Sequence, residues 1–372
     1  MWIRTAHLTP ADPWWSFPAD HHIYFFMATH PIGGFNVAPW CWRVLGPLIA
    51  GLFANPATGF QVVTFTSLWL TGAAVFALVK RSGHPLHLAV TGMLLFFSFA
   101  FAVKFNMWDF WLSDPLAFLF LALGVLCIVA EWDGLFAVCV AVGVIAKESV
   151  VFVVPLFYGL RATRLWDRRA ARRTLLVGLP SIAVLVFVRV AIPAWNSHPA
   201  YIASLPPPIR WNAHNLPTYS PWFILRQTLA RRAAQPASWF VRTVSAFGLP
   251  ALVMAACGGR RSLRLLGRAA PFLLLVLSQE LFALNTERLL ALAFPVMILL
   301  ALEGARRLEE QGVRPWVFPA LAGSSWAVCL VRATDTSPSA LVQLGVVLVF
   351  IPIVVLGIRA RGGARIGART TS

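Results

Sequence analysis

Acidic residues and lysines are scarce in this chain of 372 residues. It contains 14 Asp and Glu against 31 Lys and Arg, and its only lysines are Lys80, Lys104 and Lys147. Charged residues make up 12% of the chain and hydrophobic residues 59%, with a mean hydropathy of +0.73. This composition excludes an ordinary soluble protein and is typical of a polytopic membrane protein. The arginine bias favours a GC-rich, bacterial genome.

Cysteine motifs, a cleavable signal and internal repeats are also missing. The five cysteines show no CxxC spacing, and most lie in apolar runs where cysteine acts as a small hydrophobe. A disulfide or zinc framework is therefore not expected. The first 20 residues contain no apolar stretch of the kind that a secretion signal needs.

The apolar runs predict an all-α protein, a polytopic transmembrane bundle of about 10–11 membrane segments, because a spanning helix needs about 20 apolar residues. The candidate segments are 58–80, 85–103, 115–131, 134–147, 149–160, 174–194, 236–257, 269–285, 289–303, 316–332 and 339–358. The pair 134–147 and 149–160 is too short for two full spans. We expect a hairpin of broken helices there, with Lys147 and Glu148 at the break.

Clusters of Lys and Arg set the predicted orientation. They occur in alternate loops, at 80–81, 161–173, 260–268, 306–314 and 359–369, and mark the cytoplasmic side. The net charge of +17 thus fits a membrane protein in contact with lipids rather than nucleic acid binding. We expect a multi-pass protein of the inner (cytoplasmic) membrane.

This orientation predicts four regions. Residues 1–57 form an outer N-terminal segment with interfacial helices, and 58–303 form the core bundle with an outer loop at 195–235. Residues 304–358 add C-terminal transmembrane helices, and 359–372 form a basic cytoplasmic tail. Because 1–57 would begin outside, we expect either a further helix upstream or unaided translocation of a short tail.

The first candidate site is Asp20, His21 and His22, followed by Tyr24. Asp20 fits the N-cap of an interfacial helix, and it also fits a general base that takes a proton from a hydroxyl at the outer surface. A metal site made of His21, His22 and His30 is a further alternative, although adjacent histidines point in different directions on a helix.

Three more candidates lie in outer segments. Arg43, between Trp42 and Val44, fits either snorkelling to lipid headgroups or a clamp on an anionic group such as phosphate. Asp109, between Trp108 and Trp111, is typical of sugar-binding clefts, where acids lie beside flat aromatic faces. Asp114 precedes Pro115, which predicts an ordinary helix cap.

Two adjacent charge pairs lie within or beside apolar runs. Lys147 and Glu148 fit either a mutual salt bridge that fixes the helix break or a functional site, because charges in a membrane are expensive. Glu287 and Arg288 form a second pair at the outer end of a helix. Together with the candidates above, polar side chains thus come to the outer end of the bundle from four separate segments. This predicts a shared polar site there.

The order of these parts resembles the C-type membrane glycosyltransferases (GT-C), which use polyprenyl-phosphate sugars. The resemblance covers residues 17–303. It consists of an outer acid (Asp20), a juxtamembrane run from Ala38-Pro39 to Arg43 and Pro47, a second outer acid (Asp109 or Asp114), the Lys147-Glu148 junction and a late outer arginine (Arg288). The family's first helix would lie ahead of Asp20, where this sequence has no apolar run, and no large outer domain follows the last helix.

The resemblance implies sugar transfer from a polyprenyl-phosphate donor on the outer side. Asp20 would act as the base, and Arg43, Lys147 and Arg288 would stabilise the departing phosphate. A divalent cation held by Asp20 and Asp109 is an open alternative. A lipid or solute transporter or flippase, with charges lining a substrate path, is the second hypothesis, and a non-catalytic membrane subunit is the third.

Overall fold

The computed structural model describes residues 20–164, 166–196, 198–210, 221–234, 237–279, 286–331, 344–352 and 354–355. The first 19 residues and the predicted tail at 359–372 lie outside these ranges. The described chain is helical and contains no strand. Three of its helices are long and apolar enough to cross a membrane, at Pro56–Arg81, Arg168–Ala191 and Glu287–Glu310. The protein is therefore an all-helical, membrane-associated protein.

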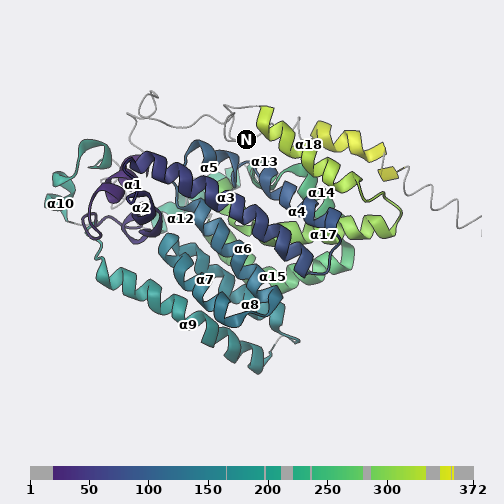
Figure 1. Cartoon of the computed structure of the whole chain (residues 1–372), viewed down its shortest axis with the longest axis horizontal. Helices are drawn as coiled ribbons and strands as arrows, with labels where there is room; N and C mark the ends of the chain where they lie inside the picture. The colour runs from purple at the N-terminus through teal and green to yellow at the C-terminus, as the bar shows by residue number, and fades with distance from the viewer. Residues whose placement is uncertain are drawn as a thin grey trace, which may run out of the picture.

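The helices of the bundle pack around one large apolar core (Figure 1). They are α3 (Pro56–Arg81), α4 (Leu86–Ser98), α6 (Asp114–Ala130), α7 (Asp133–Ala146), α8 (Val153–Arg161), α9 (Arg168–Ala191), α13 (Ala237–Phe247), α14 (Leu249–Cys257), α15 (Gly259–Gln279), α17 (Phe294–Glu310) and α18 (Val317–Val331). The short helices α16 (Thr286–Leu290) and η5 (Ala291–Ala293) lead into α17.

Local sequence explains where the long helices begin. Asn55 caps α3 by accepting a hydrogen bond from the backbone of Ala57, and Pro56 occupies the first helical position. Asp167 caps α9 in the same way, through the backbone of Arg169 and Ala170. Helix α9 leaves much of its apolar face exposed, as expected for a helix that faces lipid.

Two glycines allow very close helix contacts. A Cβ atom on Gly304 of α17 would lie 1.6 Å from the backbone oxygen of Met254 on α14. A Cβ atom on Gly159 of α8 would lie 1.9 Å from the backbone oxygen of Arg268 on α15. Small residues at such crossings are typical of helix packing in membranes, because they let two backbones approach each other.

The predicted break at Lys147 is present. Helix α7 ends at Ala146, Lys147 is extended (φ −159°, ψ 129°), and the 3₁₀ helix η4 (Glu148–Phe152) leads into α8. Arg161, at the end of α8, lies 3.6 Å from Asp133, at the start of α7. The two arms therefore run out and back as a hairpin, with the break at its tip.

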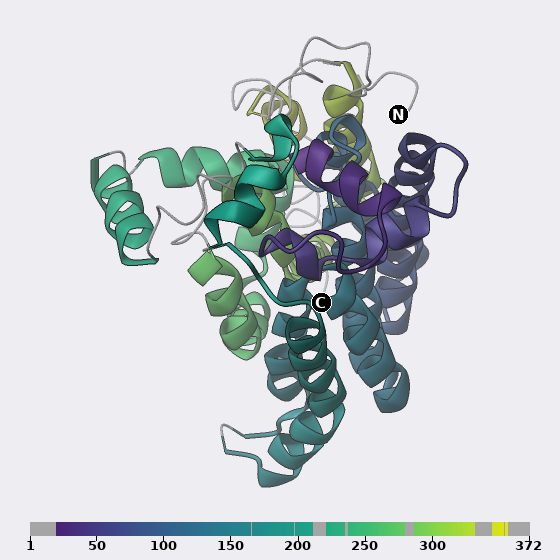
Figure 2. The same ribbon diagram turned by 90° about the vertical axis from the view of Figure 1, so that its left-hand side faces the viewer.

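A second, smaller core lies at the same end of the bundle as this tip. It joins α1 (Asp20–Thr29), η3 (Trp40–Trp42), α2 (Leu45–Ala50) and α10 (Pro199–Ser204). These elements lie at one end of the bundle in Figure 1, and this end faces the viewer in Figure 2. Hydrogen bonds tie the segments together. The backbone of Asn36 donates to the hydroxyl of Tyr201 at 2.8 Å, and the backbone of Trp195 donates to Asn36 at 2.7 Å.

Three predicted boundaries are wrong. The segment 236–257 is two helices, α13 and α14, because Gly248 has a φ of 74° that ends the first. The span predicted at 269–285 begins at Gly259, since its arginines continue the helix instead of forming a loop. The span predicted at 85–103 ends at Ser98, and α5 (Lys104–Trp108) follows. The predicted outer loop 195–235 contains α10 and α12 (Pro221–Ala234).

Charge pairs also occur at the other end of the bundle, where several of the predicted cytoplasmic arginines lie. Arg161 pairs with Glu131 at 2.5 Å, and Arg261 pairs with Glu310 at 2.8 Å. His87 also contacts Glu309 there. The two ends of the bundle thus carry separate charge clusters.

Candidate functional site

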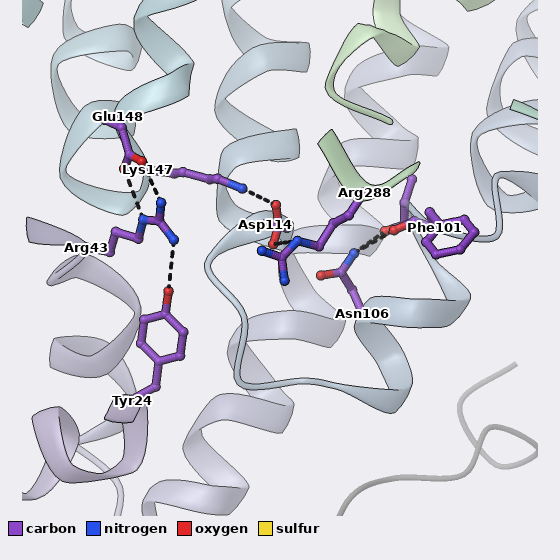
Figure 3. A network of polar contacts seen from close by, with 9 residues as sticks. Tyr24, Arg43, Phe101, Asn106, Asp114, Lys147, Glu148 and Arg288 are labelled. Atoms are coloured by element: carbon purple, nitrogen blue, oxygen red, sulfur yellow. Dashed lines mark hydrogen bonds and ion pairs between the residues drawn. The ribbon is translucent and has the colours of Figure 1, made fainter. Parts of the chain in front are cut away.

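Asp114 lies at the centre of a buried charge network (Figure 3). Its carboxylate accepts a hydrogen bond from the ammonium of Lys147 and lies 3.4 Å from Nε of Arg288. The side chains of Asp114 and Lys147 are 1% and 2% exposed. One carboxylate therefore faces two cations that come from separate segments, the break after α7 and the helix α16.

Arg43 forms the second part of the network. Its guanidinium donates two hydrogen bonds to Glu148, at 2.5 and 3.0 Å, in the bidentate geometry that makes such pairs strong. It also donates to the hydroxyl of Tyr24 at 3.4 Å. Burial by itself would lower the pKa of Arg43, but Glu148 and Tyr24 raise it well above its usual value. Arg43 therefore stays charged and points into the protein, so the snorkelling interpretation is wrong.

The backbone at the hairpin tip joins these two parts. Because Lys147 is extended, the side chains of Lys147 and Glu148 leave the chain toward different partners. Lys147 reaches Asp114, and Glu148 reaches Arg43. The mutual salt bridge considered from the sequence is thus wrong.

Asp114 does not serve as the predicted helix cap. The N-cap of α6 is Ser113, which makes no side-chain capping bond, and Asp114 is the first residue of the helix. A carboxylate in the first turn still meets the positive end of the helix dipole. Its main partners, however, are the two cations.

Asp109 is an acid with strongly perturbed surroundings outside the membrane-spanning helices. Burial, followed by the nearby charge of Asp20, raises the pKa of Asp109 to about 7. Arg288 lowers it and Asp114 raises it. Its Oδ1 atom is buried and has no hydrogen-bond partner among the described residues. Asp20, at the start of α1, is half-buried and interacts electrostatically with Asp109, Tyr24 and Arg288.

The aromatic faces predicted beside Asp109 are not both available. Trp111 is 1% exposed and packs against Phe60 at 4.7 Å and Phe25 at 5.6 Å, within the second core. Its ring therefore positions the loop, while Trp108 remains half-buried. Of the two flanking rings, only that of Trp108 is partly exposed.

The remaining candidates lie at the edge of the network. Glu287 pairs with Arg242 of α13 at 3.7 Å, while its neighbour Arg288 turns toward Asp114. The rings of His21 and His22 lie 4.1 Å apart. His30 is at the far end of α1, where it stacks on Phe26 at 3.7 Å. The three histidines thus do not gather into one site.

No group of three or more His, Cys, Asp and Glu residues gathers anywhere in the described part of the chain. Asp20 and Asp109 would supply carboxylate oxygens to a divalent cation, and Mg²⁺ is often held by one or two carboxylates plus substrate phosphates. This donor set fits a cation that binds together with a phosphate.

Asn106 of α5 is a member of the site that the sequence argument missed. It is fully buried, and its amide nitrogen donates to the backbone oxygens of Phe101 and Ala102 at 2.9 and 3.1 Å. Its Oδ1 is buried without a hydrogen-bond partner among the described residues. The available signal was a polar amide in an apolar and aromatic stretch, two residues after Lys104.

A shallow apolar cleft lies beside the network. It has an empty volume of about 300 Å³, part of it open to solvent, and it is lined by residues from Met27 to Leu48 that include Phe35, Cys41 and Val44. None of the charged groups of the network lines this cleft. The chemistry of the site is thus that of the buried charges, and the cleft is an apolar neighbour.

The site therefore combines cations, paired acids and two acids outside any ion pair within the described residues, all at one end of a helical membrane-associated protein. Such a set can bind an anionic oxygen compound and take up a proton. The chain matches no protein-family model, no curated protein and no solved structure.

Proposed function

We propose that the chain is a GT-C-type glycosyltransferase of the bacterial inner membrane. In this proposal it is a multi-pass protein that transfers a sugar from a polyprenyl-phosphate donor to an acceptor on the extracytoplasmic side. The observation that carries the proposal is the gathering of Arg43, Lys147 and Arg288, from three separate segments, around Asp114 and Glu148.

The three cations suit a phosphate group. Guanidinium presents a fork of donors that matches two phosphate oxygens, and an ammonium adds a compact charge. The cations lie beside α1, η3 and α2, which form the predicted interfacial segment. A phosphate at the membrane surface with its prenyl chain in lipid would meet this network from that side.

The proposed reaction is a displacement at the anomeric carbon of the donor sugar. A hydroxyl oxygen of the acceptor attacks this carbon while Asp20 takes the hydroxyl proton. The bond from carbon to the phosphate oxygen breaks, and its electron pair leaves with the polyprenyl phosphate. Arg43, Lys147 and Arg288 stabilise the charge that develops on this oxygen.

Asp20 is the preferred base because it begins α1 and is half-buried, so an acceptor can approach it from the aqueous side. The buried Oδ1 of Asp109 is more suited to contacts within the site. We therefore assign proton removal to Asp20 and substrate binding to Asp109, Tyr24 and the histidines beside them.

The test is a transfer assay with purified protein in lipid vesicles. The probes are undecaprenyl phosphates that carry one hexose or one pentose, with the envelope glycans of a deletion strain as acceptors. Mass spectrometry follows release of undecaprenyl phosphate and mass gain of the glycan. We expect Asp20→Asn to abolish transfer, while the control Glu310→Gln, at the opposite end, retains it.

Three outcomes separate the hypotheses. Unchanged transfer by Asp20→Asn would disprove its role as the base. Passage of the glycosylated lipid across the vesicle without release of undecaprenyl phosphate would favour a flippase. A deletion strain with unchanged lipid-linked sugars and envelope glycans would contradict the glycosyltransferase proposal itself.

A further inference from the structure

Helix α5 and the residue that directly follows it carry two buried hydrogen-bond acceptors. The first is Oδ1 of Asn106, a residue with 0% exposure. The orientation of this amide is fixed by the backbone oxygens of Phe101 and Ala102. These oxygens can only accept hydrogen bonds, so the amide nitrogen must be the atom that faces them. In Figure 3 the amide oxygen is turned to the side of the Arg288 guanidinium.

The second acceptor is Oδ1 of Asp109, which follows Asn106 by three residues at the end of α5. Three residues are about one helical turn, so the two side chains leave α5 in similar directions. Asp109 also interacts electrostatically with Arg288 and Asp20. Both acceptors thus face the region between the phosphate-binding cations and the proposed base.

Burying an acceptor without a donor costs free energy, and native proteins keep few such atoms outside functional sites. Here two acceptors occur within one turn, beside Arg288. An ionised phosphate has only acceptor oxygens, which match Lys147 and the two arginines of the network. The amide oxygen of Asn106 and the ionised carboxylate of Asp109 can only accept, so they do not serve the phosphate. The part of a ligand that contacts these two acceptor oxygens must therefore carry hydrogen-bond donors, as the hydroxyl groups of a sugar do.

We propose that Asn106 and Asp109 bind two hydroxyl groups of the donor sugar and fix the ring between the cations and Asp20. This inference rests on the proposed function, and it specifies which part of the donor each group of residues contacts. The cations hold the phosphate, and α5 holds the sugar. Asn106 and Asp109 are positioning residues in this arrangement, and selectivity among sugars would depend on where the hydroxyl donors lie.

The test compares three lipids that share the undecaprenyl phosphate part and carry no sugar, a hexose or a pentose. Binding of undecaprenyl phosphate and of its hexosyl and pentosyl forms is measured with the full-length protein in lipid nanodiscs. At pH 8, where the Asp109 carboxyl is ionised, we expect Asp109→Ala to weaken binding of at least one glycosylated lipid about tenfold or more, since a hydrogen bond to a charged acceptor is lost. Binding of bare undecaprenyl phosphate should stay the same or tighten, because a negative charge is removed near the phosphate.

Asn106→Ala provides the second variant and should show the same selectivity. It also removes the donors to Phe101 and Ala102, so its unfolding temperature is measured in parallel. Glu310→Gln is the control and should bind every lipid as the wild type does. The Asp109 variant tests the inference even where Asn106→Ala does not fold.

The outcomes distinguish this inference from the function on which it rests. Equal weakening for bare and glycosylated lipid in Asp109→Ala overturns the sugar subsite and leaves the glycosyltransferase proposal standing. A wild-type protein that binds none of the lipids overturns both. Sugar-dependent binding that EDTA removes and Mg²⁺ restores would assign these oxygens to a cation instead and would also overturn the subsite.

Discussion

Replacing Asp109 by asparagine should change how stability depends on pH. The pKa of Asp109 is about 7 in the folded protein against an ordinary value of 3.8, mainly because of burial and then because of Asp20. Between these two values the folded protein binds more protons at this site than the unfolded chain does. Stability therefore falls as pH rises from about 4 to about 7, and then changes no further.

The size of the effect follows from the shift. A pKa raised from 3.8 to about 7 corresponds to at most about 4 kcal/mol at pH 8, at about 1.4 kcal/mol per tenfold change in proton affinity. Solvent that reaches the half-buried side chain reduces this, so we expect about 2 kcal/mol. Asparagine has nearly the same shape and cannot ionise. The variant should therefore be more stable than the wild type at pH 8, and this advantage should shrink toward pH 4.

Thermal unfolding of purified protein in detergent, followed by circular dichroism, measures this difference across the pH range. The charged groups that act on Asp109 are Asp20, Arg288 and Asp114, and all three are present in both proteins. The exposed Glu310→Gln provides the control and should show no such growth with pH. A constant difference between wild type and Asp109→Asn from pH 5 to pH 8 would refute the reasoning.

Three further sets of variants test the packing and the ion pairs. Asp114→Asn leaves two buried cations without their shared counter-charge and should cost about 3–5 kcal/mol, seen as a lower unfolding temperature; an unchanged temperature would contradict a buried network. Gly304→Ala should destabilise the protein by forcing α14 from α17, while Gly267→Ala, with nothing within 4 Å, should unfold as the wild type does. Arg43→Gln and Glu148→Gln should each destabilise, and the double variant should show a coupling of about 1–3 kcal/mol; additive effects would argue against direct pairing.

Hydropathy was sufficient to predict the bounds of helices that are apolar along their whole length. The segments predicted at 58–80 and 316–332 agree with α3 and α18 to within two residues. The prediction was poor where one helix joins a charged half to an apolar half, as in α15, which begins at Gly259 instead of residue 269. Arginine is a good helix former, so a charge run does not end a helix, although it lowers a hydropathy average.

One sequence could not predict which charged residues of the site pair with each other. Residues that are neighbours in the chain, such as Lys147 and Glu148, were the natural candidates for a mutual salt bridge. An extended residue at the helix break sends them to different partners, and these partners lie far away in sequence. Individual charges within apolar runs were visible as candidates, but their distances depend on how α6, α7 and α16 pack.

The charge balance of the network bears on how the proposed reaction would proceed. Arg43 and Glu148 neutralise each other, whereas Asp114 faces two cations, so the ion-paired groups by themselves carry one positive charge in excess beside Asp20 and Asp109. A glycosyl phosphodiester carries one negative charge and would match that excess. Its cleavage yields a monoester phosphate that carries up to one further negative charge. The phosphate therefore needs more stabilisation by cations as the bond breaks. The contact of Arg288 with Asp114, at 3.4 Å, is long and leaves Nε without a hydrogen bond in the described chain. Arg288 is thus the cation best able to turn from its carboxylate to the departing phosphate, and stabilisation that grows along the reaction is the kind that accelerates it.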